Sequence, residues 1–238
     1  MKMKKYIFNF FSVLSVAVLF LSSCYPMDEN YAWLVEKGPI VYLNKPDTVV
    51  AFGGRERIRV KWYKQGDNRA TIAKLFWNGN RDSVTVDLSN HATECALESL
   101  PEGVYLIDLY FYSADGLKST STSIVGRTYG AVYESFLLNR TASLSDITED
   151  ETAYVKLTFP SFTSEGYIGS EVLYTDHTGA EKKLSITSVE SVEVKIPKSQ
   201  IANSASGMTF KVRSLYVPEP EGFSDIFYSQ WEELVHPI

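Results

Sequence analysis

The chain has 238 residues, with 23 Lys and Arg against 29 Asp and Glu, and its formal net charge is −6. Hydrophobic residues make up 45% and aromatic residues 13%, which is enough apolar material for a packed core and excludes a disordered chain. The acidic balance argues against nucleic acid as a partner, because phosphate contacts need a concentrated Lys and Arg surface. Two cysteines and three histidines are too few for a disulfide scaffold or a multi-ligand zinc site.

The first 24 residues have the features of a targeting signal. Three early lysines precede an apolar stretch, residues 7–21, which is shorter than the roughly 20 residues that span a bilayer. The sequence Leu-Ser-Ser-Cys then ends at Cys24 and resembles a bacterial lipobox, in which the cysteine is acylated and becomes the first mature residue. The alternatives are an ordinary signal peptide with an unrelated cysteine and an uncleaved membrane anchor.

Lipidation at Cys24 predicts a protein held at a membrane by its N-terminal lipid. Loss of the signal peptide, residues 1–23, leaves 20 basic and 29 acidic residues, a net charge of −9. Residues 24–38 then form a tether, in which Asp28 and Glu29 resemble the export signal of surface lipoproteins in Bacteroides-type bacteria. A solvated tether is the alternative interpretation of this acidic pair. We expect the protein in the cell envelope, at the outer membrane.

The body of the chain predicts an all-β protein, with two β-sandwiches in series after the signal peptide. Short strand patterns recur between turn residues, and no long amphipathic helix is present. The first sandwich is expected over residues 39–126. Its strands are predicted at residues 40–43, 48–52, 56–63, 72–78, 82–88, 93–97, 104–113 and 119–125. Glycine and asparagine in the turns, including the pair Gly53 and Gly54, are expected to supply positive φ angles.

Two residue patterns indicate which side chains form the core of the first sandwich and which kind of sandwich it is. Alternation directs Ile58, Val60 and Trp62 inward, and the three basic residues that alternate with them outward. The later sequence Leu-Pro-Glu-Gly-Val-Tyr, which ends at Tyr105, resembles the fibronectin type III pattern before a central strand. That resemblance covers residues 40–126 and implies that Trp62 is the core tryptophan. It also implies that Tyr105 is a corner tyrosine bonded to nearby backbone.

A connector with its own apolar anchors is expected at residues 127–147, and the second sandwich at residues 148–238. Strands of the second sandwich are predicted at residues 153–159, 169–174, 183–187, 192–196 and 208–217. A closing segment, residues 225–234, is predicted as a strand or one helical turn. No strict sequence repeat relates the two halves. The series of short strands in both halves predicts that each sandwich is immunoglobulin-like or fibronectin type III-like.

The mature chain also resembles a family of Bacteroides-type lipoproteins known only as a domain of unknown function. The resemblance is carried by Gly38 to Tyr42, Gly54, Arg55, Arg57, Leu75 to Asn78, Asp82, Ser83, Pro101 to Tyr105, Gly126, Tyr129, Gly130, Tyr133 and Leu137 to Arg140. It implies a surface or periplasmic lipoprotein, often encoded with glycan-uptake machinery. It implies no reaction, and fold alone assigns no ligand.

Motifs for catalysis or cofactor binding are not found in the sequence. His91, His177 and His236 lie far apart, outside any metal-ligand spacing, so we expect no metal and no cofactor. Cys95 has no basic neighbour to lower its pKa and is expected to be a buried, inert thiol. No catalytic residue is assigned, and we expect a protein that is not an enzyme. A carbohydrate hydrolase stays a minor alternative, because two suitably placed carboxylates would suffice for one.

The candidate binding residues are Phe76, Tyr110 and Tyr112. Strand alternation places all three rings on the outer side of neighbouring strands, where flat rings stack on sugars or anchor a protein. The alternative is that this patch docks the second sandwich or the connector, with Tyr129, Tyr133 or Phe136 as its cover. The sequence therefore predicts a lipid-anchored, non-enzymatic binding module for glycans or an envelope protein. The competing hypothesis is a structural spacer or an accessory subunit of an outer-membrane complex.

Overall fold

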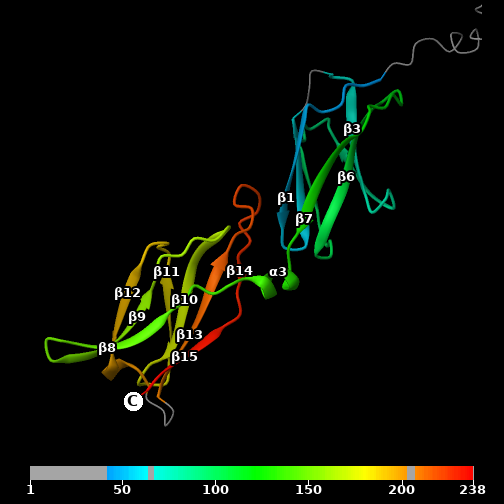
Figure 1. Ribbon diagram of the computed structural model, residues 1–238. Helices are drawn as coiled ribbons and strands as arrows, with labels where there is room; N and C mark the ends of the chain where they lie inside the picture. The colour runs from blue at the N-terminus through cyan, green and yellow to red at the C-terminus, as the bar shows by residue number, and fades with distance from the viewer. Residues whose placement is uncertain (1–41, 64–66, 203–206, 238) are drawn as a thin grey trace, which may run out of the picture. The chain divides into compact units, whose positions relative to one another are not determined.

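The computed structural model describes residues 42–63, 67–202 and 207–237 (Figure 1). The signal peptide, Cys24 and the predicted tether lie outside the described residues. The prediction of an all-β protein with two sandwiches is confirmed, because strands in four sheets make up almost all the regular structure. The only helices among the described residues are two short ones.

The first sandwich contains seven strands in two sheets. They are β1 (Thr48–Gly54), β2 (Arg57–Tyr63), β3 (Ala70–Trp77), β4 (Asp82–Asp87), β5 (Glu94–Leu97), β6 (Gly103–Ser113) and β7 (Thr122–Thr128). One sheet has the order β1-β2-β5 and the other has the order β4-β3-β6-β7, with antiparallel neighbours throughout. Seven of the eight predicted strands are found. The predicted first one lies partly outside the described residues, and its last residue, Leu43, forms an isolated bridge with Ser119.

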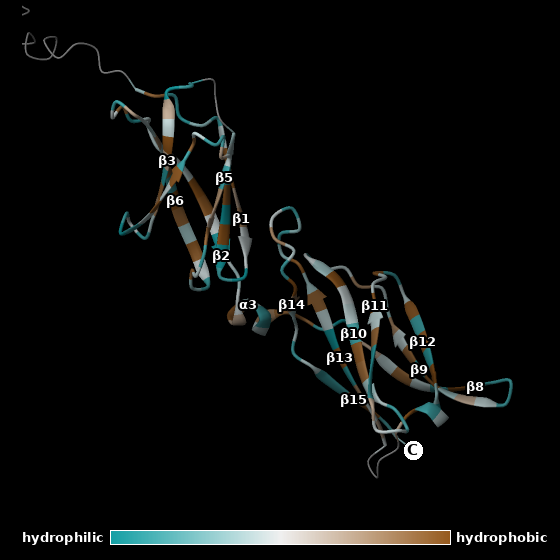
Figure 2. Ribbon diagram, turned by 180° about the vertical axis from the view of Figure 1, so that it is seen from behind, coloured by the Kyte–Doolittle hydropathy of each residue, from teal (hydrophilic) through white to brown (hydrophobic). Residues whose placement is uncertain are grey.

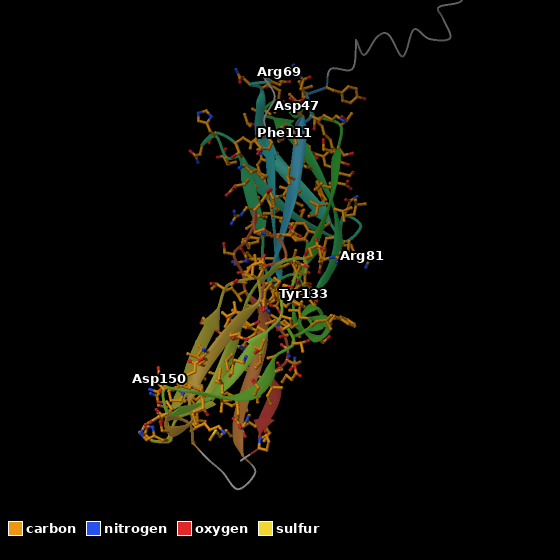
Figure 3. All side chains as sticks on the ribbon, turned by 60° about the vertical axis from the view of Figure 1, so that its left-hand side comes forward. Asp47, Arg69, Arg81, Phe111, Tyr133 and Asp150 are labelled. Atoms are coloured by element: carbon orange, nitrogen blue, oxygen red, sulfur yellow. The ribbon has the colours of Figure 1, made fainter. Side chains whose placement is uncertain are left out.

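The core of the first sandwich follows from alternation along its central strands. Ile58, Val60 and Trp62 of β2 are fully buried, and Leu109 and Phe111 of β6 meet them from the other sheet. Figure 2 shows hydrophobic and hydrophilic residues alternating along these strands, and Figure 3 shows Phe111 inside the sandwich. A period of two is what a sheet with one buried face requires.

The expected corner tyrosine is present. The Tyr105 hydroxyl donates a hydrogen bond to the Pro101 carbonyl oxygen at 2.8 Å. The Thr128 hydroxyl donates to the same oxygen at 2.7 Å, and also accepts the Gly103 amide at 2.8 Å. The loop before β6 is thereby fixed to the last strand of the sandwich.

The glycine pair between β1 and β2 has a different role from the one predicted. Gly53 and Gly54 belong to β1, and the positive φ of 53° in this turn is at Glu56. A Cβ atom on Gly53 would lie 2.2 Å from the Arg127 carbonyl oxygen. Glycine is required here because backbone approaches backbone, not because the turn needs a left-handed residue.

The second sandwich repeats the strand order of the first. Its strands are β8 (Ser143–Glu149), β9 (Thr152–Phe159), β10 (Tyr167–Thr175), β11 (Glu181–Ile186), β12 (Val192–Pro197), β13 (Met208–Tyr216), β14 (Phe227–Tyr228) and β15 (Glu232–His236), with the 3-10 turn η1 (Lys198–Gln200) after β12. One sheet is β12-β9-β8. The other is β11-β10-β13, with β14 and β15 both paired to β13. The second core contains Val155, Leu157, Phe159, Phe210 and Val212.

Strand β8 begins inside the stretch expected to be a connector. Its only large apolar residues, Leu144 and Ile147, are three positions apart, so they do not show the alternation of a half-buried strand. The strand forms through a ladder of backbone pairs to β9, from Ser143 opposite Thr158 to Glu149 opposite Thr152. The hairpin turn holds Asp150 and Glu151 at positive φ, and Figure 3 shows Asp150 at its tip.

The connector contains the short helix α3 (Ala131–Phe136). The Glu102 carboxylate, from the loop before β6, accepts the backbone amides of Val132 at 2.7 Å and Tyr133 at 2.6 Å. A carboxylate at this end satisfies amides that have no partner inside the helix and interacts favourably with its dipole. The helix is therefore attached to the first sandwich.

Arg140, just after the helix, is completely buried. Its guanidinium donates to the carbonyl oxygens of Pro160 at 2.7 Å, Ser188 at 2.6 Å and Glu190. Its backbone amide donates to the Ser214 hydroxyl at 2.8 Å. A buried polar group is tolerated only when its hydrogen-bonding capacity is used, and here one side chain ties two loops of the second sandwich to the incoming chain.

The loop between β13 and β14 binds the end of the first sandwich. The Glu219 carboxylate accepts the Gly53 amide at 2.5 Å and the Tyr129 hydroxyl at 2.9 Å. Arg57 pairs with Asp225 at 2.7 Å. Burial and the hydrogen bond to Glu219 both raise the pKa of Tyr129, so its hydroxyl stays a donor at physiological pH. We call this set of contacts, together with the ring cluster around Phe227 described below, the junction.

Candidate functional site

The sheet register places the predicted binding residues on one face. Lys74 is opposite Tyr110, and Ile72 is opposite Tyr112, in the β3–β6 pair. Phe76 is two residues beyond Lys74, and therefore projects to the same side. The residues between them, Ala73 and Leu75, are fully buried in the core. Phe76, Tyr110 and Tyr112 accordingly lie on the outer side of the four-stranded sheet, as predicted from alternation.

The three rings are half-buried by one another and by lysine side chains. Phe76 and Tyr110 meet edge to face with ring centroids 5.8 Å apart. The Lys118 ammonium lies 3.8 Å from the centroid of Tyr110 and 5.7 Å from that of Tyr112. The Lys74 ammonium lies about equally far from Phe76 and Tyr112, at 5.9 and 6.0 Å. The patch therefore presents ring edges and two ammonium groups to a ligand.

The other half of the same sheet face is aliphatic. Val104 and Leu106 of β6 are 62% and 59% exposed, and Val125 of β7, opposite Leu106, is 60% exposed. Large aliphatic side chains gathered on one sheet face with this exposure mark a contact surface more often than single scattered ones do. We call this aliphatic half together with the aromatic patch the open face.

The charged side chains of the open face have no oppositely charged partner in the described part of the chain. Lys74, Asp108, Lys118 and Arg127 form no ion pair among the described residues. Asp108 accepts a hydrogen bond from the Ser123 hydroxyl at 2.5 Å and has no cation beside it. Unpaired charges around apolar groups are available to a ligand or a partner.

Two of the connector aromatics that were the alternative cover for the patch, Tyr129 and Tyr133, pack against Phe227 instead, and the third, Phe136, is 77% exposed. Tyr133 contacts Tyr129 at 4.8 Å and Phe227 at 5.3 Å between centroids. The Arg55 guanidinium lies 4.4 Å from the Phe227 centroid and pairs with Glu134 at 2.8 Å. The residue patterns that resemble the lipoprotein family, including Arg55, Tyr129 and Tyr133, thus build the junction.

Two hollows beside α3 were not foreseen from the sequence. One, of about 230 Å³, is lined by Val104, Val132 and Phe136 among others. A second, of about 290 Å³, contains Leu138 and Glu165. Four residues line both hollows, and they are Arg127, Tyr129, Tyr133 and Phe136. We call the two hollows together the α3 groove. The only signal in the sequence was the cluster of apolar residues in the expected connector.

The three histidines and Cys95 form no reactive cluster in the described part of the chain. His91 and His177 are exposed, and His236 is buried with its Nε2 atom 3.1 Å from Asp146. No cluster of three metal-ligating side chains occurs among the described residues. Cys95 is half-buried, and burial raises the pKa of its thiol, which disfavours the reactive thiolate.

The fold and the open face together define a tandem fibronectin type III-like β-sandwich protein. The chain matches the family model DUF4998, a domain of unknown function, over residues 24–225, and it belongs to that family. No curated protein matches it. In the described part of the chain, no helix has the length and apolar character needed to cross a membrane.

Several solved structures from chicken are similar to the chain. The FN1–FN3 domains of CNTN1 match 82% of this chain with 10% identity and a TM-score of 0.40, and this chain spans 65% of their length. A two-domain fibronectin type III segment of tenascin matches 82% of the chain and 100% of its own, with 16% identity and a TM-score of 0.33. The interferon gamma receptor alpha chain matches 82% of the chain and 99% of its own, with 14% identity and a TM-score of 0.31.

Proposed function

We propose that this protein is a lipid-anchored lipoprotein of the cell envelope, at the outer membrane, and that it acts as a non-enzymatic binding module. The open face is its binding surface, and glycans are its ligands. The observation that carries the proposal is the combination of three outward rings with two unpaired lysines on one rigid sheet. Rings contact the C–H face or edge of a sugar, and ammonium groups donate to its hydroxyls.

The lysines define how such a ligand is accommodated. Lys118 covers Tyr110, so a sugar that stacks on this ring has to displace the Lys118 side chain. A lysine side chain is long and flexible, and its displaced ammonium still reaches the bound hydroxyls. The site on the open face therefore favours sugars that present both a C–H surface and several oxygen acceptors.

A binding role without catalysis is also supported by the hollows. Each of them is lined by a single carboxylate, Glu102 or Glu165, whereas most glycoside hydrolases require a facing pair. Glu102 is already engaged with two backbone amides of α3. This arrangement makes the carbohydrate hydrolase the weaker alternative.

The junction favours a second candidate function, that of a spacer or accessory subunit. Two carboxylates of one loop, Glu219 and Asp225, bind the first sandwich through Gly53, Tyr129 and Arg57. Such multiple contacts resist bending between the sandwiches, as a spacer requires. A spacer needs no ligand on the open face, and this difference separates the two candidates by experiment.

The binding proposal is tested with the double variant Tyr110→Ala/Tyr112→Ala on an array of defined neutral and acidic oligosaccharides. We expect the unaltered chain to bind a subset of them, and the variant to lose at least about tenfold in affinity, since stacking on each ring is worth of order 1 kcal/mol. Tyr63→Ala is the matched control, because Tyr63 is 53% exposed on the other sheet and lies near Lys61. Binding that is absent, or unaffected by the double variant, supports the spacer.

The lipid anchor is tested separately with Cys24→Ala. Acylation of a cysteine needs its thiol, so the variant should move from the membrane fraction to the soluble fraction, as judged by cell fractionation and mass spectrometry of the N-terminal peptide. Cys95→Ala is the control and should stay with the membrane. Retention of the Cys24→Ala protein in the membrane fraction contradicts the lipid anchor.

A further inference from the structure

A second apolar surface continues from the open face across α3. Val104, at the end of the open face, and Val132 and Phe136, on the helix, line the same hollow. Leu138 lies in the adjoining hollow. Val132, Phe136 and Leu138 are 60%, 77% and 71% exposed. Burying apolar side chains of this size removes them from water and is favourable, so the stripe is suited to a partner.

The shape of the α3 groove combines a projection with adjacent recesses. Phe136 is the most exposed of the large hydrophobic residues described, and hollows of about 230 and 290 Å³ lie against it. A cavity of about 150 Å³ already accommodates a benzene ring. The α3 groove thus carries the projecting ring of Phe136 together with a hollow that is large enough for the Phe136 ring of a second molecule.

The groove also contains charged side chains of both signs. Arg127 and Glu165 both line the larger hollow and are exposed. Neither side chain forms an ion pair or a hydrogen bond among the described residues. The other ionised residues near α3 are already engaged, Glu102 with backbone amides and Glu134 with Arg55. The groove therefore offers one free cation and one free anion.

We propose that the α3 groove is the contact surface for a second copy of this chain. In a two-fold symmetric dimer every contact occurs twice: if one residue of the first copy contacts a second residue of the other copy, the reverse contact also forms. Phe136 of each copy enters a hollow of its partner, and Arg127 of each copy pairs with Glu165 of the other. A surface that holds a projection with a recess, and a cation with an anion, is self-complementary in this sense. The proposal is independent of any glycan on the open face.

Charge-reversal variants of the full chain test the proposal, with dimerisation measured by sedimentation velocity in the buffer or detergent in which the chain is isolated. Arg127→Glu alone places like charges at both contacts, and so does Glu165→Arg alone. Each variant should dimerise at least about tenfold more weakly than the unaltered chain. Mixed together, the two variants pair a glutamate with an arginine at both contacts, and the mixed dimer should recover to within about threefold of the original affinity.

Apolar variants complete the test. Phe136→Ser should weaken the dimer at least about tenfold, whereas Val235→Ser, at a 48% exposed residue of β15 outside the groove, should leave it unchanged. All variants change exposed side chains, and circular dichroism checks that each is folded. A chain that stays monomeric at several hundred micromolar overturns the proposal. So does a dimer that is indifferent to Phe136→Ser, or a mixture of the two charge variants that shows no recovery.

Discussion

The two sandwiches share one strand order but treat their polar groups differently. On the outer sheet face of the second sandwich one cluster of charges is satisfied within the molecule, because Glu171 is buried and bonded to Lys183 at 3.0 Å and Arg213 at 2.7 Å. Arg213 is in turn stacked between Tyr228 and Trp231, 3.9 and 4.3 Å from their ring centroids. The corresponding face of the first sandwich leaves both its rings and its charges open.

This difference shows that strand topology and surface role are set by separate residues. The inward positions of both sandwiches carry the same kinds of apolar side chains, such as Val60 and Trp62 in one and Leu157 and Phe159 in the other. Outward positions are free to vary without changing the fold, because they contribute little to the core. One sandwich uses them to close its surface and the other to expose a contact surface.

The largest difference in stability between the two sandwiches is expected from the substitution Arg140→Met. Methionine fills much of the space of arginine but leaves the carbonyl oxygens of Pro160, Ser188 and Glu190 without donors in a buried site. Each unsatisfied buried group costs about 1–3 kcal/mol, so the second sandwich should lose about 3 kcal/mol or more of unfolding free energy. Hydrogen exchange followed by mass spectrometry should show faster exchange in residues 143–236 and little change in residues 48–128. Equal effects in both sandwiches contradict this assignment.

A smaller effect is expected from Glu171→Gln, compared with Asp108→Asn on the open face. Burial of Glu171 opposes its ionisation, but hydrogen bonds from Lys183 and Arg213 outweigh burial and hold its pKa below the usual value for a glutamate. The unfolded chain therefore binds more protons in acid, so this contribution is present above about pH 4.5 and is lost as the pH falls through the folded-state pKa.

Denaturant unfolding at pH 7 and at pH 3 measures this contrast. Glu171→Gln should cost about 1–3 kcal/mol at pH 7, the range for hydrogen bonds to charged groups, and much less at pH 3. Asp108→Asn should stay within about 0.5 kcal/mol at both values, as for an ordinary surface substitution. If the two substitutions cost the same at pH 7, the faces do not differ as described.

Much of the fold was predictable because inward residues alternate regularly. The inward positions of Ile58, Val60 and Trp62 follow from spacing alone, and so does the outward direction of Phe76. The role of Tyr105 was an implication of the resemblance to the fibronectin type III pattern. Strand β8 was not predictable, since its ladder to β9 uses backbone groups that carry no sequence pattern. The role of Gly53 was also hidden, because a close approach to the Arg127 backbone depends on a strand that is distant in the sequence.

The side of the sheet on which the candidate site lies was predictable, but the side-chain contacts within the site were not. Alternation placed Tyr110 and Tyr112 on the outer face, and the order of neighbouring strands brought Phe76 beside them. The ammonium group over Tyr110 belongs to Lys118, which reaches it across a hairpin whose shape the sequence does not reveal. The α3 groove depends on residues from both sandwiches, such as Arg127 and Glu165, and only tertiary structure brings them together. Whether the open face binds a ligand stays a prediction.

The attachment of α3 to Glu102 has a consequence for how the chain acquires its structure. A helix of six residues is too short to persist alone in water, so it forms only when the loop bearing Glu102 is already in place. Domains generally fold as units, with the N-terminal one first as a chain emerges from synthesis. The completed first sandwich thus fixes the start of the chain segment that leads, over residues 137–140, to the buried Arg140 of the second sandwich.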